Sequence, residues 1–134
     1  MRVLPKSVLI AEDDTDVLDF LRALLLGEGC EVYTANDGDD AVLTAIREHP
    51  DAIILDVMMP GKSGFEALRE LRADSRTAHI PVIMLTAVND YELGVGHDRE
   101  STGRKLGVAA PEAFLEKPVR SEALLEALAT AIED

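Results

Sequence analysis

Residues 52–61 read Ala52-Ile-Ile-Leu-Asp-Val-Met-Met-Pro-Gly61, an apolar run that stops at an acid. The four residues from Ala52 to Leu55 are all apolar, and a short run of this kind is typical of a strand buried on both faces. We therefore predict a central strand over residues 52–55, with Asp56 at its carboxyl end.

Similar apolar runs recur along the chain and alternate with segments of helical periodicity. The other predicted strands cover residues 7–11, 30–34, 81–85 and 113–115. The predicted helices cover residues 15–28, 37–48, 64–73 and 121–132. Because strands that alternate with helices form parallel sheets through right-handed crossovers, we predict a doubly wound α/β fold with helices on both faces.

Several side chains are expected to have only a structural place in this fold. The first predicted helix carries an apolar stripe that should face the core, formed by Val17, Leu18, Phe20, Leu21, Leu24 and Leu25. Cys30 is predicted to be a small buried hydrophobe. His49, His79 and His97 lie in or beside predicted loops, where we expect surface positions rather than metal ligands.

Composition limits the class of protein. The 134 residues suit one domain over residues 1–134, and 47% of them are hydrophobic. The formal net charge is −13, which disfavours nucleic acid as a direct partner because phosphate binding depends on Lys and Arg. One cysteine, no apolar run of about 20 residues and no apolar leader over Met1 to Ser7 lead us to expect a cytoplasmic protein away from the membrane.

Polar side chains follow four of the predicted strands at the point where each strand ends. The segments are Glu12-Asp13-Asp14, Asp56, Thr86 and Glu116-Lys117-Pro118. In a doubly wound sheet, ligands bind outside the carboxyl ends of the strands, where the strand order reverses. We therefore expect carboxylates, a hydroxyl and an ammonium group to converge on one site.

Carboxylates gathered in one place repel each other strongly. Two unit charges about 4 Å apart interact by roughly 4 kcal/mol at an effective dielectric near 20, so the site must raise a pKa or hold a cation. Oxygen ligands without His or Cys favour Mg²⁺, which in turn suits phosphoryl oxygens. Lys117 would neutralise a phosphoryl oxygen, Thr86 would bond another, and Asp56 would be the nucleophile that forms an acyl phosphate.

Four sequence strings carry a resemblance to a known family. They are Val8-Leu-Ile-Ala-Glu-Asp-Asp14, Ile54-Leu-Asp-Val-Met-Met-Pro-Gly61 with Gly64, Val82-Ile-Met-Leu-Thr-Ala87 and Phe114-Leu-Glu-Lys-Pro118. In this order they resemble the response-regulator receiver domain of two-component systems over nearly the whole chain. The resemblance implies a flavodoxin-like, five-stranded parallel sheet with strand order 2-1-3-4-5.

The resemblance also implies a metal-dependent phosphoacceptor site. Asp56 would accept the phosphoryl group, and the ion would be Mg²⁺, with Mn²⁺ as the alternative. Asp13 and Asp56 would bind the ion directly, Glu12 largely through water, and Met58 through its backbone carbonyl.

The remaining implied roles concern signalling. Thr86 and Lys117 would contact the phosphoryl group, and Thr86 and Phe114 would form a switch. The donor would be a phosphohistidine on a sensor histidine kinase or a histidine phosphotransfer protein. The output would lie in a downstream protein or a separate output domain. Such a domain assists its own phosphorylation and dephosphorylation without being a turnover enzyme.

One departure from the family concerns the segment between Thr86 and Lys117, which are 31 positions apart. This spacing is longer than is usual in the family. We interpret residues 88–107, which are polar and contain four glycines, as an atypical insertion around the fourth helix. The pattern allows a helix over residues 99–106.

Alternative functions make different demands on the sequence. An aspartate-based phosphatase of the haloacid-dehalogenase type needs a second Asp two residues after the nucleophile, where this chain has Met58. A degenerate receiver that acts only as a protein-binding module lacks the acceptor or the acids, which are all present here. A flavin or nucleotide binder is disfavoured by 4% aromatic residues and by Gly61-Lys62-Ser63, which lacks the earlier glycine of a phosphate-binding loop.

A structural alternative concerns the acids after the first strand. Asp13 or Asp14 could simply cap the first helix, because Asp is favoured at that position.

Overall fold

The computed structural model describes residues 2–87 and 110–133. Within these residues, five strands form one parallel sheet in the order β2-β1-β3-β4-β5, as predicted. The strands are β1 (Ser7–Ala11), β2 (Glu31–Ala35), β3 (Ala52–Asp56), β4 (Val82–Thr86) and β5 (Ala113–Glu116). The helices are α1 (Thr15–Gly27), α2 (Gly38–Glu48), α3 (Gly64–Ala73) and α5 (Ser121–Ala131).

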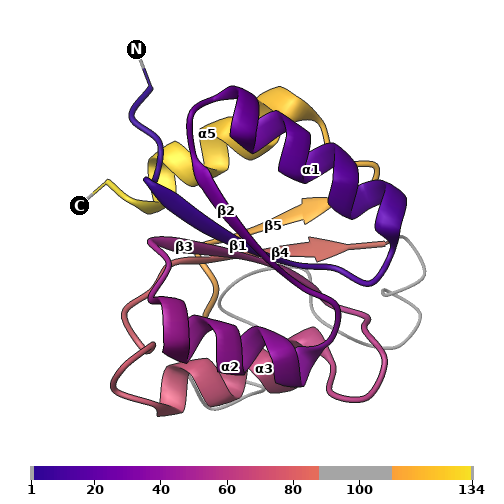
Figure 1. Ribbon diagram of the computed structural model, residues 1–134, viewed down its shortest axis with the longest axis vertical. Helices are drawn as coiled ribbons and strands as arrows, with labels where there is room; N and C mark the ends of the chain where they lie inside the picture. The colour runs from indigo at the N-terminus through magenta and orange to yellow at the C-terminus, as the bar shows by residue number, and fades with distance from the viewer. Residues whose placement is uncertain (1, 88–109, 134) are drawn as a thin grey trace.

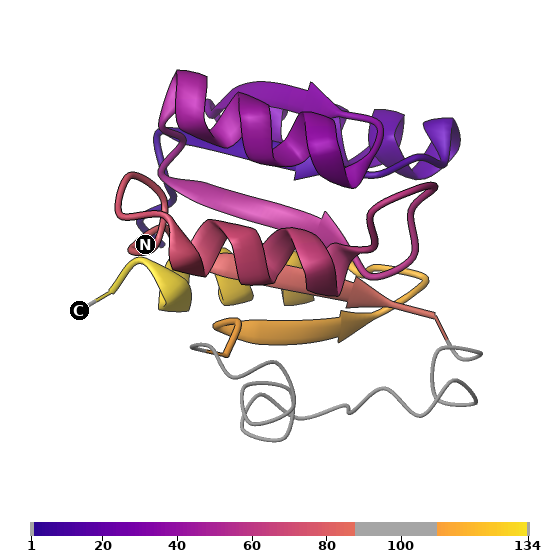
Figure 2. The same ribbon diagram turned by 90° about the horizontal axis from the view of Figure 1, so that it is seen from below.

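The helices cover both faces of the sheet. Helices α1 and α5 lie on one face, and α2 and α3 lie on the other (Figure 1). The strand arrows point the same way when the molecule is turned by 90° (Figure 2), so all carboxyl ends meet at one edge. Because both faces are covered, every residue of β1, β3 and β4 is buried.

Alternate residues of the strands pack into two separate apolar cores, one on each face of the sheet. Leu9, Ile53, Leu55 and Met84 pack towards α2 and α3. Val8, Ile10, Ile54 and Leu85 pack towards α1 and α5. The register keeps the two sets apart, since Ile54 of β3 lies opposite Ile10 on one side and Ile83 on the other. The central strands are thereby held firmly, and the residues at their ends have fixed positions.

Some predicted boundaries move by one residue. Strand β2 begins at Glu31 rather than Cys30, and β3, β4 and β5 each extend to the polar residue that was expected to follow them. The reason is the ladder itself, because Asp56 pairs with Leu85, and Thr86 pairs with Glu116. The polar residues are thus part of the sheet rather than loop residues beyond it.

The predicted position of Phe20 in the core is wrong. Phe20 is 45% exposed, whereas Leu21 and Leu25 of the same helix are fully buried. The stripe read from the sequence is wider than the strip of α1 that the sheet can cover, and Phe20 falls on its outer margin. Cys30 is buried, and His49 and His79 are exposed, as predicted.

The predicted insertion over residues 88–107, the helix within it and His97 lie outside the described residues. In the described part of the chain, no helix combines the length and the apolar character that a membrane crossing requires.

Candidate functional site

The ends of three strands bring three acidic or basic side chains to one place. Glu12 directly follows β1, Asp56 ends β3, and Lys117 directly follows β5. Asp56 is held by its pairing with Leu85 in the sheet, and the other two positions are fixed by backbone bonds beyond the strand. The Glu12 N–H donates to the Ala35 carbonyl at 3.0 Å, and the Lys117 N–H donates to the Thr86 carbonyl at 2.7 Å.

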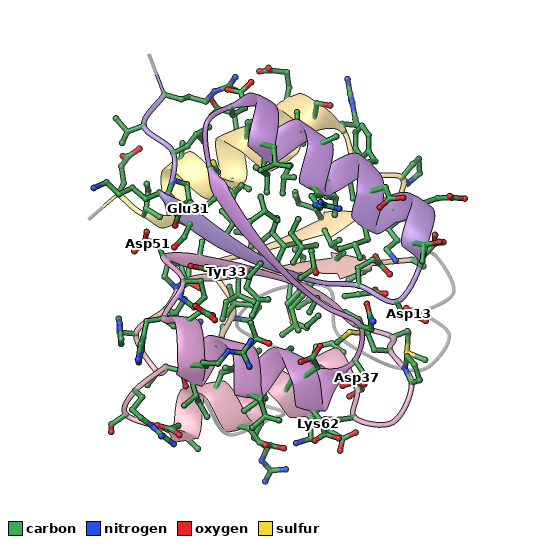
Figure 3. The ribbon with its side chains drawn as sticks, in the orientation of Figure 1. Asp13, Glu31, Tyr33, Asp37, Asp51 and Lys62 are labelled. Atoms are coloured by element: carbon green, nitrogen blue, oxygen red, sulfur yellow. The ribbon has the colours of Figure 1, made fainter. Side chains whose placement is uncertain are left out.

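Three carboxylates share this site. Glu12, Asp13 and Asp56 each offer one oxygen, and the three oxygens lie within 4.8 Å of one another. Glu12 and Asp56 are buried, whereas Asp13 is exposed at the same end of the sheet (Figure 3). The expected convergence of distant segments is therefore present in the structure, while the roles of the residues stay predictions.

Lys117 supplies the positive charge that faces these acids. Its Nζ lies 2.9 Å from Glu12 Oε1 and 3.1 Å from Asp56 Oδ2. Burial alone would lower the pKa of Lys117, but the close approach and the negative charges of Glu12 and Asp56 outweigh it, and the pKa is raised. Lys117 is therefore a firmly protonated group at the site.

The single ammonium group of Lys117 does not neutralise all of the carboxylates. Burial, reinforced by the neighbouring carboxylate of Glu12, raises the pKa of Asp56 to about 7, although Lys117 acts in the opposite direction. Glu12 Oε2 accepts a hydrogen bond from the Asp14 N–H at 3.1 Å. Among the described residues, Glu12 Oε1 has no aligned hydrogen-bond donor, since its contact with Lys117 is an ion pair by distance alone.

Three carboxylate oxygens gathered within 4.8 Å of one another, with one ammonium group facing them, fit a hard cation. The donor set consists of oxygens, with no His or Cys in the cluster, and this chemistry suits Mg²⁺ better than the softer transition metals.

The neighbouring acid, Asp14, has a different task. Its side chain accepts hydrogen bonds from the backbone N–H groups of Asp16 and Val17, at 3.0 and 3.3 Å, and so caps α1. The capping alternative therefore holds for Asp14. It leaves Asp13 available to the acidic cluster.

The two predicted switch residues lie on the neighbouring strands β4 and β5. Thr86 is buried at the end of β4. Phe114 of β5 lies opposite Met84 and packs, partly buried, against the core beneath α3. Its ring is 6.4 Å from the ring of Phe65, at a tilted angle. The predicted metal ligand Met58 lies in the loop after β3 and is about half exposed.

The contacts made by Lys62 could not be predicted from the sequence. Its Nζ lies 3.0 Å from Asp39 Oδ1 of α2 and also pairs with Glu70 of α3. Lys62 belongs to the segment Gly61-Lys62-Ser63, and its partner Asp39 is too distant in sequence for a local pattern to connect the two residues.

Fold and site together define a doubly wound parallel α/β domain with an acidic, lysine-containing pocket at the carboxyl edge of its sheet. The family model described as the response regulator receiver domain matches residues 8–129. The chain belongs to this family.

Individual relatives agree with this assignment. The chain is 39% identical over 112 residues to the response regulator PleD of Caulobacter vibrioides, a match that covers 84% of this chain and 23% of PleD. A response regulator receiver domain protein from Clostridium thermocellum superposes with a TM-score of 0.78 at 27% identity, covering 94% and 93% of the two chains. The receiver domain of a sensor histidine kinase from Pseudomonas aeruginosa, which carries magnesium in its active-site cleft, gives 0.79 at 31% identity, covering 95% and 97%.

Proposed function

We propose that this domain accepts a phosphoryl group on Asp56 in a Mg²⁺-dependent reaction and signals through the resulting change of surface. The observation that carries the proposal is the cluster of Glu12, Asp13 and Asp56 carboxylate oxygens within 4.8 Å, with Lys117 paired to two of them. The magnesium in the active-site cleft of the Pseudomonas aeruginosa receiver domain supports the choice of ion.

The proposed direct metal ligands are the side chains of Asp13 and Asp56 and the backbone carbonyl of Met58, and Glu12 would bind the ion largely through water. Bound there, Mg²⁺ would offset the negative charge of the phosphoryl oxygens and of the carboxylates. Mn²⁺, with the same preference for oxygen ligands, is the alternative ion.

The chain's own residues then carry the transfer. An Asp56 oxygen attacks the phosphorus of a phosphohistidine, so that an O–P bond forms, the N–P bond breaks and the imidazole leaves with its electron pair. The Lys117 ammonium group neutralises a phosphoryl oxygen, and the Thr86 hydroxyl donates to another. Attack by water on the acyl phosphate later releases inorganic phosphate and returns Asp56 to its free carboxylate.

The phosphoryl group would shift an existing equilibrium between an inactive and an active form of the domain's surface. It adds charge and acceptor oxygens at Asp56, which Thr86 and Phe114 would follow as a linked switch. The donor would be a sensor histidine kinase or a histidine phosphotransfer protein. The receiver of the signal would be a downstream protein or an output domain, in the cytoplasm.

The test is phosphorylation by a small donor such as acetyl phosphate, followed by intact-protein mass spectrometry. The wild type should gain one phosphoryl group in Mg²⁺ and none in EDTA. Asp56→Asn should gain none, whereas the matched control Asp19→Asn, which removes an exposed aspartate from α1, should behave as the wild type. Equal labelling of the wild type and Asp56→Asn would refute the proposal.

A further inference from the structure

The loop between β3 and α3, which carries Met58, is closed by its two ends. The Val57 N–H donates to the Leu85 carbonyl at 3.0 Å, and the Gly64 N–H donates to the Val57 carbonyl at 2.8 Å. Gly64 lies so close to β3 that an added Cβ would meet the backbone of Asp56 and sit 2.9 Å from the Val57 Cα. The ends of the loop are thus fixed against the strand that carries Asp56.

The far side of the loop is held by Lys62. Its ammonium group pairs with Asp39 of α2 and Glu70 of α3, and its side chain is only 18% exposed. Hydrogen bonds to Glu70 and then to Asp39 raise the pKa of Lys62, so it stays charged. One loop residue therefore links the loop to two helices, and Figure 3 shows Lys62 beside them.

The backbone and stem of Lys62 are also in direct contact with α2. A Cβ added to Gly38, the first residue of that helix, would meet the Lys62 carbonyl and lie 2.8 Å from the Lys62 Cβ. No larger residue fits there unless the loop moves. The start of α2 therefore rests on Lys62, and the ion pair and the close packing act on the same residue.

We propose that Lys62 is a positioning residue for the metal site: its clamp between α2 and α3 holds the 57–63 loop so that the Met58 carbonyl is available to the ion. This inference rests on the proposed function. Lys62 touches neither the acids nor Lys117 through any contact described above, so it acts through the loop alone.

A positioning role and a purely electrostatic role of Lys62 predict opposite changes in Mg²⁺ affinity when its charge is removed. Removing a positive charge near a cation site should tighten binding of the ion if charge alone matters. Removing a group that orients a ligand typically weakens metal affinity about 10-fold or more. The sign of the change in Mg²⁺ affinity therefore separates the two explanations.

The experiment is a Mg²⁺ titration followed by amide chemical shifts in two-dimensional NMR, on the full chain. Lys62→Met, which keeps the apolar stem, should raise the dissociation constant about 10-fold, and Lys62→Arg should restore most of the affinity. Arg47→Met makes the same change in net charge at an exposed position of α2 and is the matched control. Unchanged or tighter binding by Lys62→Met would overturn the inference.

A second variant covers the case in which Lys62→Met does not fold. Glu70→Gln removes one partner of the clamp at a more exposed position of α3 and should also weaken Mg²⁺ binding. Asp16→Asn, which removes one negative charge at the first turn of α1, should weaken it less; equal effects of the two would overturn the inference. Failure of the wild type to bind Mg²⁺ would instead reject the proposed function, and the inference with it.

Discussion

Two ionic clusters lie at opposite ends of the sheet, and they differ in how their charges are matched. At the amino end, the Arg72 side chain is 4% exposed and pairs with Glu112 at 3.0 Å. Its guanidinium also donates to the carbonyls of Ala78, Ile80 and Ala110, at 3.2, 2.7 and 3.2 Å. At the carboxyl end, three carboxylates face one lysine.

In the amino-end cluster the positive and negative charges are matched, whereas in the carboxyl-end cluster they are not. Glu112 Oε1 accepts from the Val82 N–H at 2.6 Å as well as from Arg72, so the pair joins α3 to the starts of β4 and β5. At the other end, three carboxylates face a single ammonium group, so negative charge is in excess, and the pKa of Asp56 is raised accordingly. Each cluster contains a buried charged side chain, and charge balance is what distinguishes an anchor from a candidate site.

The largest effect on stability should come from breaking the amino-end cluster. Arg72→Met removes the buried charged donor that Glu112 and three carbonyls share, and we expect a loss of about 3 to 5 kcal/mol in the free energy of unfolding. Urea denaturation measures this loss. The double variant Arg72→Met/Glu112→Gln should lose less than the sum of the single changes. A loss below about 1 kcal/mol in Arg72→Met would show that the cluster is no anchor.

Removing a charge from the carboxyl-end cluster should instead increase the free energy of unfolding. In EDTA, Asp56→Asn removes a buried charge that its surroundings disfavour, and we expect the protein to gain about 1 to 3 kcal/mol in the free energy of unfolding. The same urea experiment measures the gain. A loss of stability in Asp56→Asn would mean that Lys117 already balances the acids.

The pH dependence sharpens this contrast. The pKa of Asp56 is raised to about 7 in the folded state, above its usual value, so the folded state holds this proton more tightly than the unfolded state. Stability from this group is therefore present at low pH and is lost as the pH rises from about 4 to about 7. The advantage of Asp56→Asn over the wild type in EDTA should grow across that window and then level off. A constant difference between pH 5 and 8 would contradict the shift.

The smallest expected changes in stability concern the adjacent residues Asp13 and Asp14, and they should distinguish a metal ligand from a helix cap. Asp14→Ala removes the cap of α1 and should cost about 1 kcal/mol while leaving the response to Mg²⁺ intact. Asp13→Ala should change stability in EDTA by less than about 0.5 kcal/mol but should weaken the response to Mg²⁺. Urea denaturation with and without Mg²⁺ gives both quantities, and an exchange of the two outcomes would reassign the residues.

The strands and the acidic site could be predicted because their signals are local. Apolar runs that stop at Glu12, Asp56 and Thr86 mark both the strands and the edge at which they meet. The ion pairs Arg72–Glu112 and Lys62–Asp39 could not be predicted, because tertiary packing rather than sequence spacing brings their partners together.

Burial of individual helix residues was less predictable than the fold. Helical periodicity identifies an apolar side of α1 but not how much of that side the sheet covers, and this is why Phe20 was misplaced.

The most direct measurement is the free energy of unfolding of the wild type and of Asp56→Asn as a function of Mg²⁺ concentration. An ion that binds only the folded state stabilises it by about 2.7 kcal/mol at a concentration 100 times the dissociation constant. We expect the wild type to gain stability steadily with Mg²⁺ and Asp56→Asn to gain much less. A wild type that is indifferent to Mg²⁺, or equal gains in both proteins, would contradict the assignment of the acidic cluster as a metal site.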